Sequence, residues 1–278
     1  MTTQPALQVP SDALTKKLLR KAVGGSVSLY SFLELLCIDD IYVFKDEFDK
    51  GFDESVWAHY KFPEDDPEED FHPSGQNFEI RADDPCGVLS FDPGVGDGDY
   101  CSLLQRQRTW LPNRRPCVMG RFRLAASAGN FKAEFGFADV SVSLLQDARG
   151  CVNVKSTPTA QQGRTDFAVA VYDSDHDNNT DVVVHSRPHT TRGGRSGPSQ
   201  PALDTDFSML VSTNEMNEAR LWINGALAAQ ARLGSPTSRY VVQPLAIWFY
   251  FENRATTGDR ERVRIDYIRA WQERAAIV

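Results

Sequence analysis

The stretch FKAEFGFADVSVSL, residues Phe131–Leu144, decides the fold class of this 278-residue chain. Large apolar residues alternate along it with small or charged residues, and this period of two predicts a β-strand lying across the middle of a sheet. The alternation places Phe135 and Phe137 on the core side of that sheet and Glu134 on the opposite face. With Asp139, Glu134 makes the strand the first candidate for a functional site.

The chain from residue 41 onward repeats this pattern in short β-rich runs. Clusters of Gly, Pro, Asp and Asn separate the runs, as is typical of an antiparallel sandwich or barrel. No helical segments of about 10–15 residues alternate with them, which excludes a βαβ architecture. The predicted strands are Ile41–Phe48, Trp57–Phe62, Asn77–Ala82, Gly87–Phe91, Tyr100–Gln105, Cys117–Leu124, Phe131–Phe137, Phe167–Tyr172, Asp181–His185, Phe207–Ser212, Ala219–Ile223, Ala226–Ala231, Leu245–Phe251 and Arg262–Trp271.

Three segments carry the sharpest local predictions. Asn224-Gly225 stands between two of the strands and predicts a type I′ hairpin turn. Leu245–Phe251 is apolar on both faces and predicts a central strand. Arg262–Trp271 alternates strictly, so that Val263, Ile265, Tyr267 and Arg269 are expected on one face. The Gly/Pro/Ser-rich segment 187–201 is expected to be a long loop, either a mobile tip or a clasp between subunits.

Residues 1–40 differ from the rest of the chain. They predict an extended segment followed by one or two short helices, because Ser11 is a suitable N-cap and Gly24-Gly25 a suitable stop. Residues 1–36 hold four basic and two acidic side chains, a net charge of +2. Because the whole chain has a net charge of −8, the remaining residues together carry a net charge of −10. The open alternatives are a solvated helix packed on its own domain and an arm that docks on another subunit. The apolar residues expected to anchor such an arm are Leu14, Leu18, Leu19, Tyr30, Phe32, Leu33 and Leu36.

The composition limits the classes of function. The net charge of −8 argues against broad binding of nucleic acid or anionic membrane. No apolar run is long enough for a spanning helix, and the first residues lack the pattern of a secretory signal. Five cysteines without a CxxC pair suggest free thiols in a reducing cytoplasm rather than a zinc site or a disulfide framework.

Three segments resemble the concanavalin A-like lectin and glucanase superfamily. Phe44-Lys-Asp-Glu-Phe48-Asp49 followed by Trp57 resembles its opening, Leu221–Ala228 its hairpin, and Ile265–Trp271 its closing strand. The resemblance implies an all-β antiparallel β-sandwich, a concanavalin A-like jelly roll, over residues 41–278. Residues 1–40 then form the N-terminal extended and helical arm.

A narrower likeness joins residues 132–140, 153–159 and 167–175. Together they are similar to tailed-bacteriophage virion proteins with a lectin-like domain. This resemblance implies a capsid decoration, head-fibre or tail-associated component. It implies synthesis in the host cytoplasm and residence on the virion surface.

The superfamily resemblance also gives Glu134 and Asp139 possible roles. Retaining glucanases of this fold carry an ExDxE or ExDxxE strand, whose outer carboxylates are nucleophile and acid and whose middle Asp tunes them. Here Glu134 stands at the position of the nucleophile, and Gly136 replaces the middle Asp. Asp139 stands at the position of the acid, where the glucanases have the longer Glu. We therefore expect no enzyme, and keep Glu134 and Asp139 as candidate ligand-binding residues.

No metal or cofactor is expected. The turn 173–178 resembles the start of a calcium loop, but Asn178 and Val184 stand where that loop needs Gly and Glu. An exposed loop is the preferred interpretation, and calcium at Asp173–Asp177 is the open alternative. The histidines form no HxH or HExxH pattern.

The sequence therefore favours a non-enzymatic structural virion protein, anchored by its arm and displaying a lectin-like sandwich. The expected partners are the major capsid protein or neighbouring copies in a homo-oligomer, with a trimer favoured, and no nucleic acid or membrane. The alternatives are a tail-associated adhesin that binds a host-surface glycan and, less favoured, a glycoside hydrolase.

Overall fold

The structure is a computed structural model, and it describes residues that follow the predicted arm. These are residues 41–48, 52–62, 78–80, 88–91, 93, 96–124, 130–142, 150–152, 160, 165–174, 177–186, 189–195, 204–214, 218–232, 243–254 and 263–273. The predicted arm, with its candidate assembly residues, lies outside them. Its helices and its anchoring role stay predictions.

The described strands form two sheets, and every pair of neighbouring strands is antiparallel. The nine-stranded sheet has the order β11 (Gly194–Arg195), β14 (Ala226–Arg232), β13 (Glu218–Ile223), β12 (Phe207–Thr213), β6 (Cys117–Leu124), β16 (Val263–Glu273), β4 (Leu89–Phe91) and β3 (Phe78–Ile80), and β1 (Ile41–Asp46) also pairs with β16. The seven-stranded sheet has the order β10 (His189–Arg192), β9 (Asp177–Ser186), β8 (Asp166–Asp173), β7 (Phe131–Ala138), β15 (Ala246–Asn253), β5 (Tyr100–Gln105) and β2 (Trp57–Phe62).

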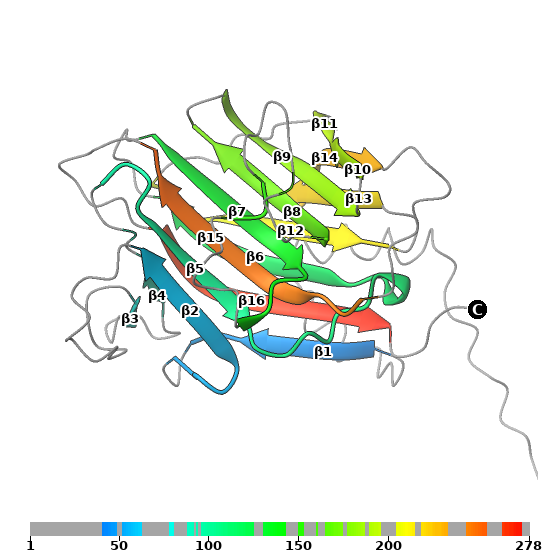
Figure 1. Cartoon of the computed structure of the whole chain (residues 1–278), viewed down its shortest axis with the longest axis horizontal. Coiled ribbons are helices and arrows are strands. Elements are labelled where there is room, and N and C mark those ends of the chain that lie inside the picture. Colours follow the sequence, from blue (N-terminus) through cyan, green and yellow to red (C-terminus); the bar gives the residue numbers. More distant parts are fainter. Residues whose placement is uncertain are drawn as a thin grey trace, which may run out of the picture. The chain divides into compact units, whose positions relative to one another are not determined.

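The two sheets lie face to face as a β-sandwich (Figure 1). The all-β antiparallel fold predicted from the sequence is therefore confirmed. The one described helix is a single turn of 3₁₀-helix, η1 (Pro112–Arg114), and no helix in the described part of the chain is long and apolar enough to cross a membrane.

A cluster of phenylalanines holds the sheets together. Phe122 on β6 packs edge-on against Phe135 on β7, with ring centroids 4.7 Å apart, and stacks with Phe249 on β15 at 6.0 Å. All three rings are buried. Each such side chain stabilises the fold by about 1.5–3 kcal/mol through removal of apolar surface from water. The prediction that Phe135 and Phe137 belong to the core face of their strand is confirmed, since both join this cluster.

The opening motif has a clear structural role. The Asp46 carboxylate accepts hydrogen bonds from the Phe48 backbone N–H at 2.8 Å and from the Trp57 indole N–H at 2.7 Å. Phe48 and Trp57 are both fully buried. One carboxylate therefore joins the end of β1 in one sheet to the start of β2 in the other.

Each of the fourteen predicted strands has a counterpart, with ends that differ by a few residues. The Asn224-Gly225 turn is confirmed, because both residues have positive φ, 49° and 79°, as a type I′ turn requires. Leu245–Phe251 is confirmed as central, since β15 lies between β7 and β5. The loop predicted over 187–201 is partly wrong, because β10 and β11 lie within it.

The last strand does not alternate strictly. A β-bulge between Ile265 and Tyr267 shifts the register of β16 against β6. A bulge inserts an extra residue and so reverses the faces beyond it. Val263 and Ile265 face the core before the bulge, but Ile268 and Ala270 face it afterwards. The prediction that Tyr267 and Arg269 share a face with Val263 is therefore wrong.

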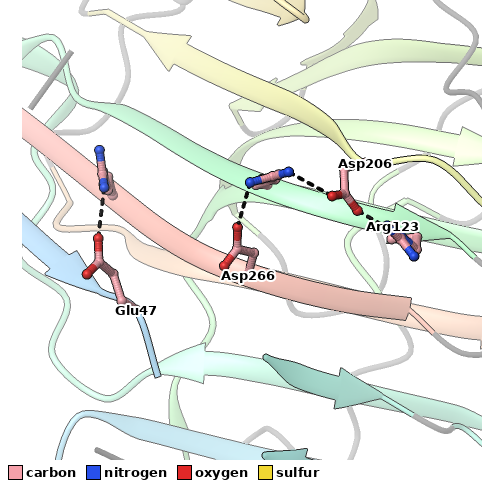
Figure 2. Close-up of polar contacts among 6 residues, drawn as sticks. Glu47, Arg123, Asp206 and Asp266 are labelled. Atoms are coloured by element: carbon pink, nitrogen blue, oxygen red, sulfur yellow. Dashed lines mark hydrogen bonds and ion pairs between the residues drawn. The ribbon is translucent and has the colours of Figure 1, made fainter. Parts of the chain in front are cut away.

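Ion pairs tie distant segments together on the outer face of the nine-stranded sheet, the face turned away from the other sheet (Figure 2). Arg121 on β6 contacts Asp266 on β16 at 3.1 Å and Asp206, just before β12, at 2.7 Å. Arg123 contacts the other Asp206 oxygen at 2.7 Å. These hydrogen bonds and positive charges lower the pKa of Asp206 despite partial burial. Because the side chains are substantially exposed, each pair contributes at most about 1 kcal/mol.

Candidate functional site

The outer face of the seven-stranded sheet carries the predicted site residue Glu134. The register aligns Glu134 on β7 with Tyr250 on β15 and with Val171 on β8. Its neighbours in sequence, Ala133 and Phe135, point the other way into the core between the sheets. The orientation predicted from the alternation of this strand is therefore correct.

Both carboxylate oxygens of Glu134 are already engaged. Oε1 lies 2.8 Å from the Lys132 ammonium and accepts the Val152 backbone N–H at 3.0 Å. Oε2 accepts the Cys151 backbone N–H at 2.6 Å and the Trp248 indole N–H at 3.1 Å. The Lys132 and Glu134 side chains are 1% and 0% exposed. Together these contacts form a sealed ion pair rather than an accessible carboxylate.

The ion pair keeps Glu134 ionised. Burial alone would raise the pKa of Glu134, but the Lys132 ammonium and the hydrogen bonds from Lys132, Cys151 and Val152 hold that pKa below its usual value. The Lys132 ammonium also donates to the Val152 carbonyl and lies 5.3 Å from the centroid of the Tyr250 ring.

Glu134 is covered by the segment Gly150–Val152. Gly150 has a positive φ of 87°, and a Cβ atom there would lie 2.8 Å from Glu134 Oε1 and 3.1 Å from Lys132 Nζ. Only glycine lets the backbone approach this closely. Cys151 and Val152 then pack with Val140, Trp248 and other apolar residues as a second buried cluster on this face. The chain's own backbone therefore fills the place over Glu134 where a groove would bring a ligand.

Gly136, the residue in place of the glucanase Asp, cannot carry a side chain in this backbone. Its φ is 155°, and a Cβ atom there would lie 2.2 Å from the Ala168 carbonyl oxygen and 2.9 Å from the Val169 Cα. Both contacts are with backbone of the neighbouring strand β8. The middle carboxylate is thus excluded by strand packing.

Asp139 belongs to a different hydrogen-bond network. Its Oδ2 accepts the Thr165 backbone N–H at 2.9 Å and the Thr165 hydroxyl. Its backbone N–H donates to the Asp166 carbonyl at 3.1 Å, which joins the residue after β7 to the first residue of β8. The structure gives Glu134 and Asp139 no shared partner among the described residues. Their role as ligand-binding residues stays a prediction.

A second buried carboxyl lies beside Asp139. Asp166 is 3% exposed, and its Oδ1 accepts the Ser186 hydroxyl at 2.8 Å. Burial, aided by repulsion from Asp139, raises the pKa of Asp166 in spite of its hydrogen bonds. Ionised Asp166 therefore costs folding free energy at neutral pH.

We expect Asp166→Asn to raise the urea midpoint of unfolding at pH 7, because the amide keeps the Ser186 hydrogen bond and removes the buried charge. A raised pKa contributes stability that is present below the unfolded value and is lost as pH rises through the folded value. The gain over wild type should therefore shrink as pH falls toward the ordinary Asp range. Urea unfolding of both proteins from pH 4 to pH 8 measures this difference, and a gain that is constant with pH would contradict it.

Five aromatic side chains extend from the sealed ion pair to the edge of the sheet. This aromatic row consists of Trp248 and Tyr250 on β15, Tyr100 on β5, and Tyr60 and Phe62 on β2. Trp248 and Tyr250 stack with centroids 6.1 Å apart, Tyr100 lies 5.4 Å from Tyr250, and Phe62 stacks on Tyr100 at 5.4 Å and 16°. The first three rings are buried, whereas Phe62 is 38% exposed. The sequence did not reveal the row, because only strand pairing brings the three strands together.

A polar pair borders the aromatic row. The Tyr250 hydroxyl donates to Glu252 Oε2 at 3.0 Å, and Arg254 lies 3.4 Å from the same oxygen. Burial is the largest influence on Glu252 and raises its pKa, against the opposing charges of Lys132 and Arg254. Burial and the two nearby carboxylates likewise raise the pKa of Tyr250 well above its usual value. This end of the site combines an aromatic surface with donors and acceptors.

The described residues include no group of three or more His, Cys, Asp or Glu side chains that could hold a metal ion. The loop of the calcium alternative, Asp173–Asp177, lies partly outside the described residues, and calcium binding there stays a prediction.

The structure resembles solved proteins that recognise or cleave carbohydrate. The Emp47p carbohydrate recognition domain matches with a TM-score of 0.52 at 10% identity, over 84% of this chain and 95% of its own. SCLam, a non-specific endo-β-1,3(4)-glucanase from family GH16, matches at 0.53 and 12% identity, over 85% and 92%. A chain from a study of endo-acting O-glycanases of human gut bacteria that initiate mucin breakdown matches at 0.55 and 12% identity, over 82% and 97%. Searches with the sequence against protein-family models and curated proteins find no match.

These likenesses define the fold of the chain as a concanavalin A-like jelly roll, as the sequence resemblance implied. The fold is shared by a recognition domain and by hydrolases, so the fold alone leaves open whether this protein is an enzyme.

Proposed function

We propose that the protein is a non-catalytic glycan-binding protein. The sealed carboxylate of Glu134 carries this proposal. A retaining hydrolase needs an accessible nucleophile about 5–5.5 Å from a carboxylic acid. Here four donors saturate the residue at the nucleophile position, and backbone covers it.

Two features support glycan binding rather than a purely structural role. The jelly-roll fold is that of a solved carbohydrate recognition domain. On the same sheet face, the aromatic row ends in an exposed phenylalanine on β2, and a carboxylate and a guanidinium lie two strands away on and just after β15. Sugar sites combine such aromatic surfaces with a few oriented polar groups.

The test is a glycan array read together with a hydrolysis assay on the full chain. We expect binding to at least one glycan class, and no new reducing ends from mixed-linkage β-glucan, laminarin or mucin O-glycans. If the purified protein releases reducing ends, the proposal that it is not a hydrolase is overturned. If the protein binds no glycan on the array, the proposal that it is a glycan-binding protein is overturned.

The placement of this protein on a bacteriophage particle extends the proposal and rests on the sequence resemblance alone. In this view residues 1–40 attach the sandwich to capsid protein or sister subunits, and the sandwich faces outward. Immunogold labelling of purified particles with an antibody against residues 41–278 tests the placement, and unlabelled particles would remove it.

A further inference from the structure

We propose that the end of the seven-stranded sheet formed by Phe62, Tyr100, Glu252 and Arg254 is the sugar-binding site, and that it takes a neutral pyranose. This inference rests on the proposed glycan-binding function and moves the site away from Glu134.

The strand register builds this site. Phe62 on β2 pairs with Tyr100 on β5, and Tyr100 pairs with Glu252 on β15. The three residues therefore lie in one row across neighbouring strands, on the outer face of the sheet. Two strand spacings separate Phe62 from Glu252, which is about 10 Å. This span suits one sugar ring packed on the Phe62 side chain with its hydroxyl groups toward the carboxylate.

Accessibility separates this end from the sealed centre. Phe62 is 38% exposed, and the side chains of Glu252 and Arg254 are 15% and 26% exposed. Lys132, which continues the same row on β7, and Glu134, one row further along the sheet, are essentially inaccessible. A ligand that approaches this end of the face can therefore contact the exposed Phe62 ring and the partly exposed Glu252–Arg254 pair, but not the Lys132–Glu134 pair.

The chemistry of the row matches a sugar. One face of a pyranose presents C–H groups that pack on an aromatic ring, and its edge presents hydroxyls that donate to a carboxylate and accept from a guanidinium. The Phe62 ring is held flat against Tyr100, and the Glu252 carboxylate is oriented by the Tyr250 hydroxyl. A preorganised site of this kind loses little side-chain freedom when a ligand binds.

The charges favour a neutral sugar over an acidic one. Arg254 is paired with Glu252, so the site presents no net positive charge from this pair. The chain as a whole carries −8, which repels sialic and uronic acids.

The test compares Phe62→Ala and Glu252→Gln with wild type by calorimetric titration of cellotetraose, laminaritetraose and a neutral mucin-type core oligosaccharide. We expect Phe62→Ala to weaken binding at least tenfold and Glu252→Gln severalfold, since the amide keeps the Tyr250 hydrogen bond but accepts sugar hydroxyls less strongly. Tyr42→Ala is the matched control, because Tyr42 is an equally exposed aromatic residue, at 38%, on the other sheet. Its affinity should equal that of wild type.

The outcomes separate the two proposals. Wild-type binding that survives both substitutions would overturn this site but leave the glycan-binding function standing. If the wild-type protein binds only sialylated or uronate glycans, the proposal that the ligand is a neutral sugar is overturned. A wild type that binds no glycan on the array would overturn the proposed function itself.

Discussion

Replacement of Lys132 by methionine should lower the free energy of unfolding by about 3–5 kcal/mol, because the change leaves a buried carboxylate without its cation. Methionine fills a similar volume, so the loss reports the charge rather than a cavity. The Glu134 carboxylate would keep the Cys151 and Val152 N–H groups, but it would lose the ammonium 2.8 Å away that keeps its pKa low. Urea unfolding at pH 7 measures the change.

The double variant Lys132→Met with Glu134→Gln should recover part of this loss. A neutral glutamine oxygen can still accept the N–H groups of Cys151 and Val152, and no unpaired charge remains inside. Residues in direct contact couple by about 0.5–3 kcal/mol, so the double loss should fall short of the sum of the single losses.

Lys45→Met is the matched control for the charge removal. Lys45 also lies 2.8 Å from a glutamate, Glu47, but these side chains are 33% and 30% exposed. A solvated pair of this kind contributes at most about 1 kcal/mol. If Lys132→Met costs no more than Lys45→Met, the Lys132–Glu134 pair does not stabilise the fold and our account of it fails.

Urea unfolding of the Glu134→Gln variant distinguishes a structural role of Glu134 from a catalytic one. Catalytic residues are often held in strained or unfavourable surroundings, so their replacement tends to preserve or increase stability while activity is lost. In the sealed arrangement Glu134→Gln leaves the Lys132 ammonium buried beside an amide. A marked loss of stability in this variant would therefore be the signature of a structural carboxylate.

Periodicity predicted the orientation of Glu134 but not its surroundings. The alternation in Phe131–Ala138 is a local property of the sequence, and it correctly predicted that Phe135 faces the core and Glu134 the opposite side of the sheet. The cover over Glu134 comes from Gly150–Val152, which carries no periodic signal and is placed by tertiary contacts. Gly150 allows this approach through its positive φ of 87°, which the sequence alone does not indicate.

Two other differences have the same origin in pairing. β10 lies in a Gly/Pro/Ser-rich segment with weak strand propensity and forms because Thr190 and Thr191 pair with His185 and Val184 on β9. The bulge in β16 is likewise invisible in an alternating sequence, because the extra residue matters only against the register of β6. Strands with a strong local pattern were thus predicted from the sequence, whereas β10, β11 and the faces beyond the bulge in β16 depend on strand pairing and were not.

Replacement of Gly136 by aspartate, which would restore the middle carboxylate of the glucanase pattern, should unfold the domain or destabilise it more than any other single change considered. The first atom of any side chain there would lie 2.2 Å from the Ala168 carbonyl oxygen, so β7 and β8 would have to separate. Both strands lie inside the seven-stranded sheet, and their neighbours resist that movement. The aspartate would also add a charge next to the ionised, buried Glu134.

Gly136→Ala isolates the steric part of this effect, and we expect it to cost about 3 kcal/mol or more from the sum of backbone strain and overpacking. Gly98→Ala is the matched control, because Gly98 also has a positive φ, 82°, but a Cβ atom there would have no other atom within 4 Å. That change should cost only the strain of a left-handed alanine, about 1–2 kcal/mol. Urea unfolding of both variants gives the difference. Equal losses would mean that β8 moves aside freely and that a glucanase-like carboxylate could be accommodated, whereas a larger loss at Gly136 means that strand packing itself excludes the catalytic pattern.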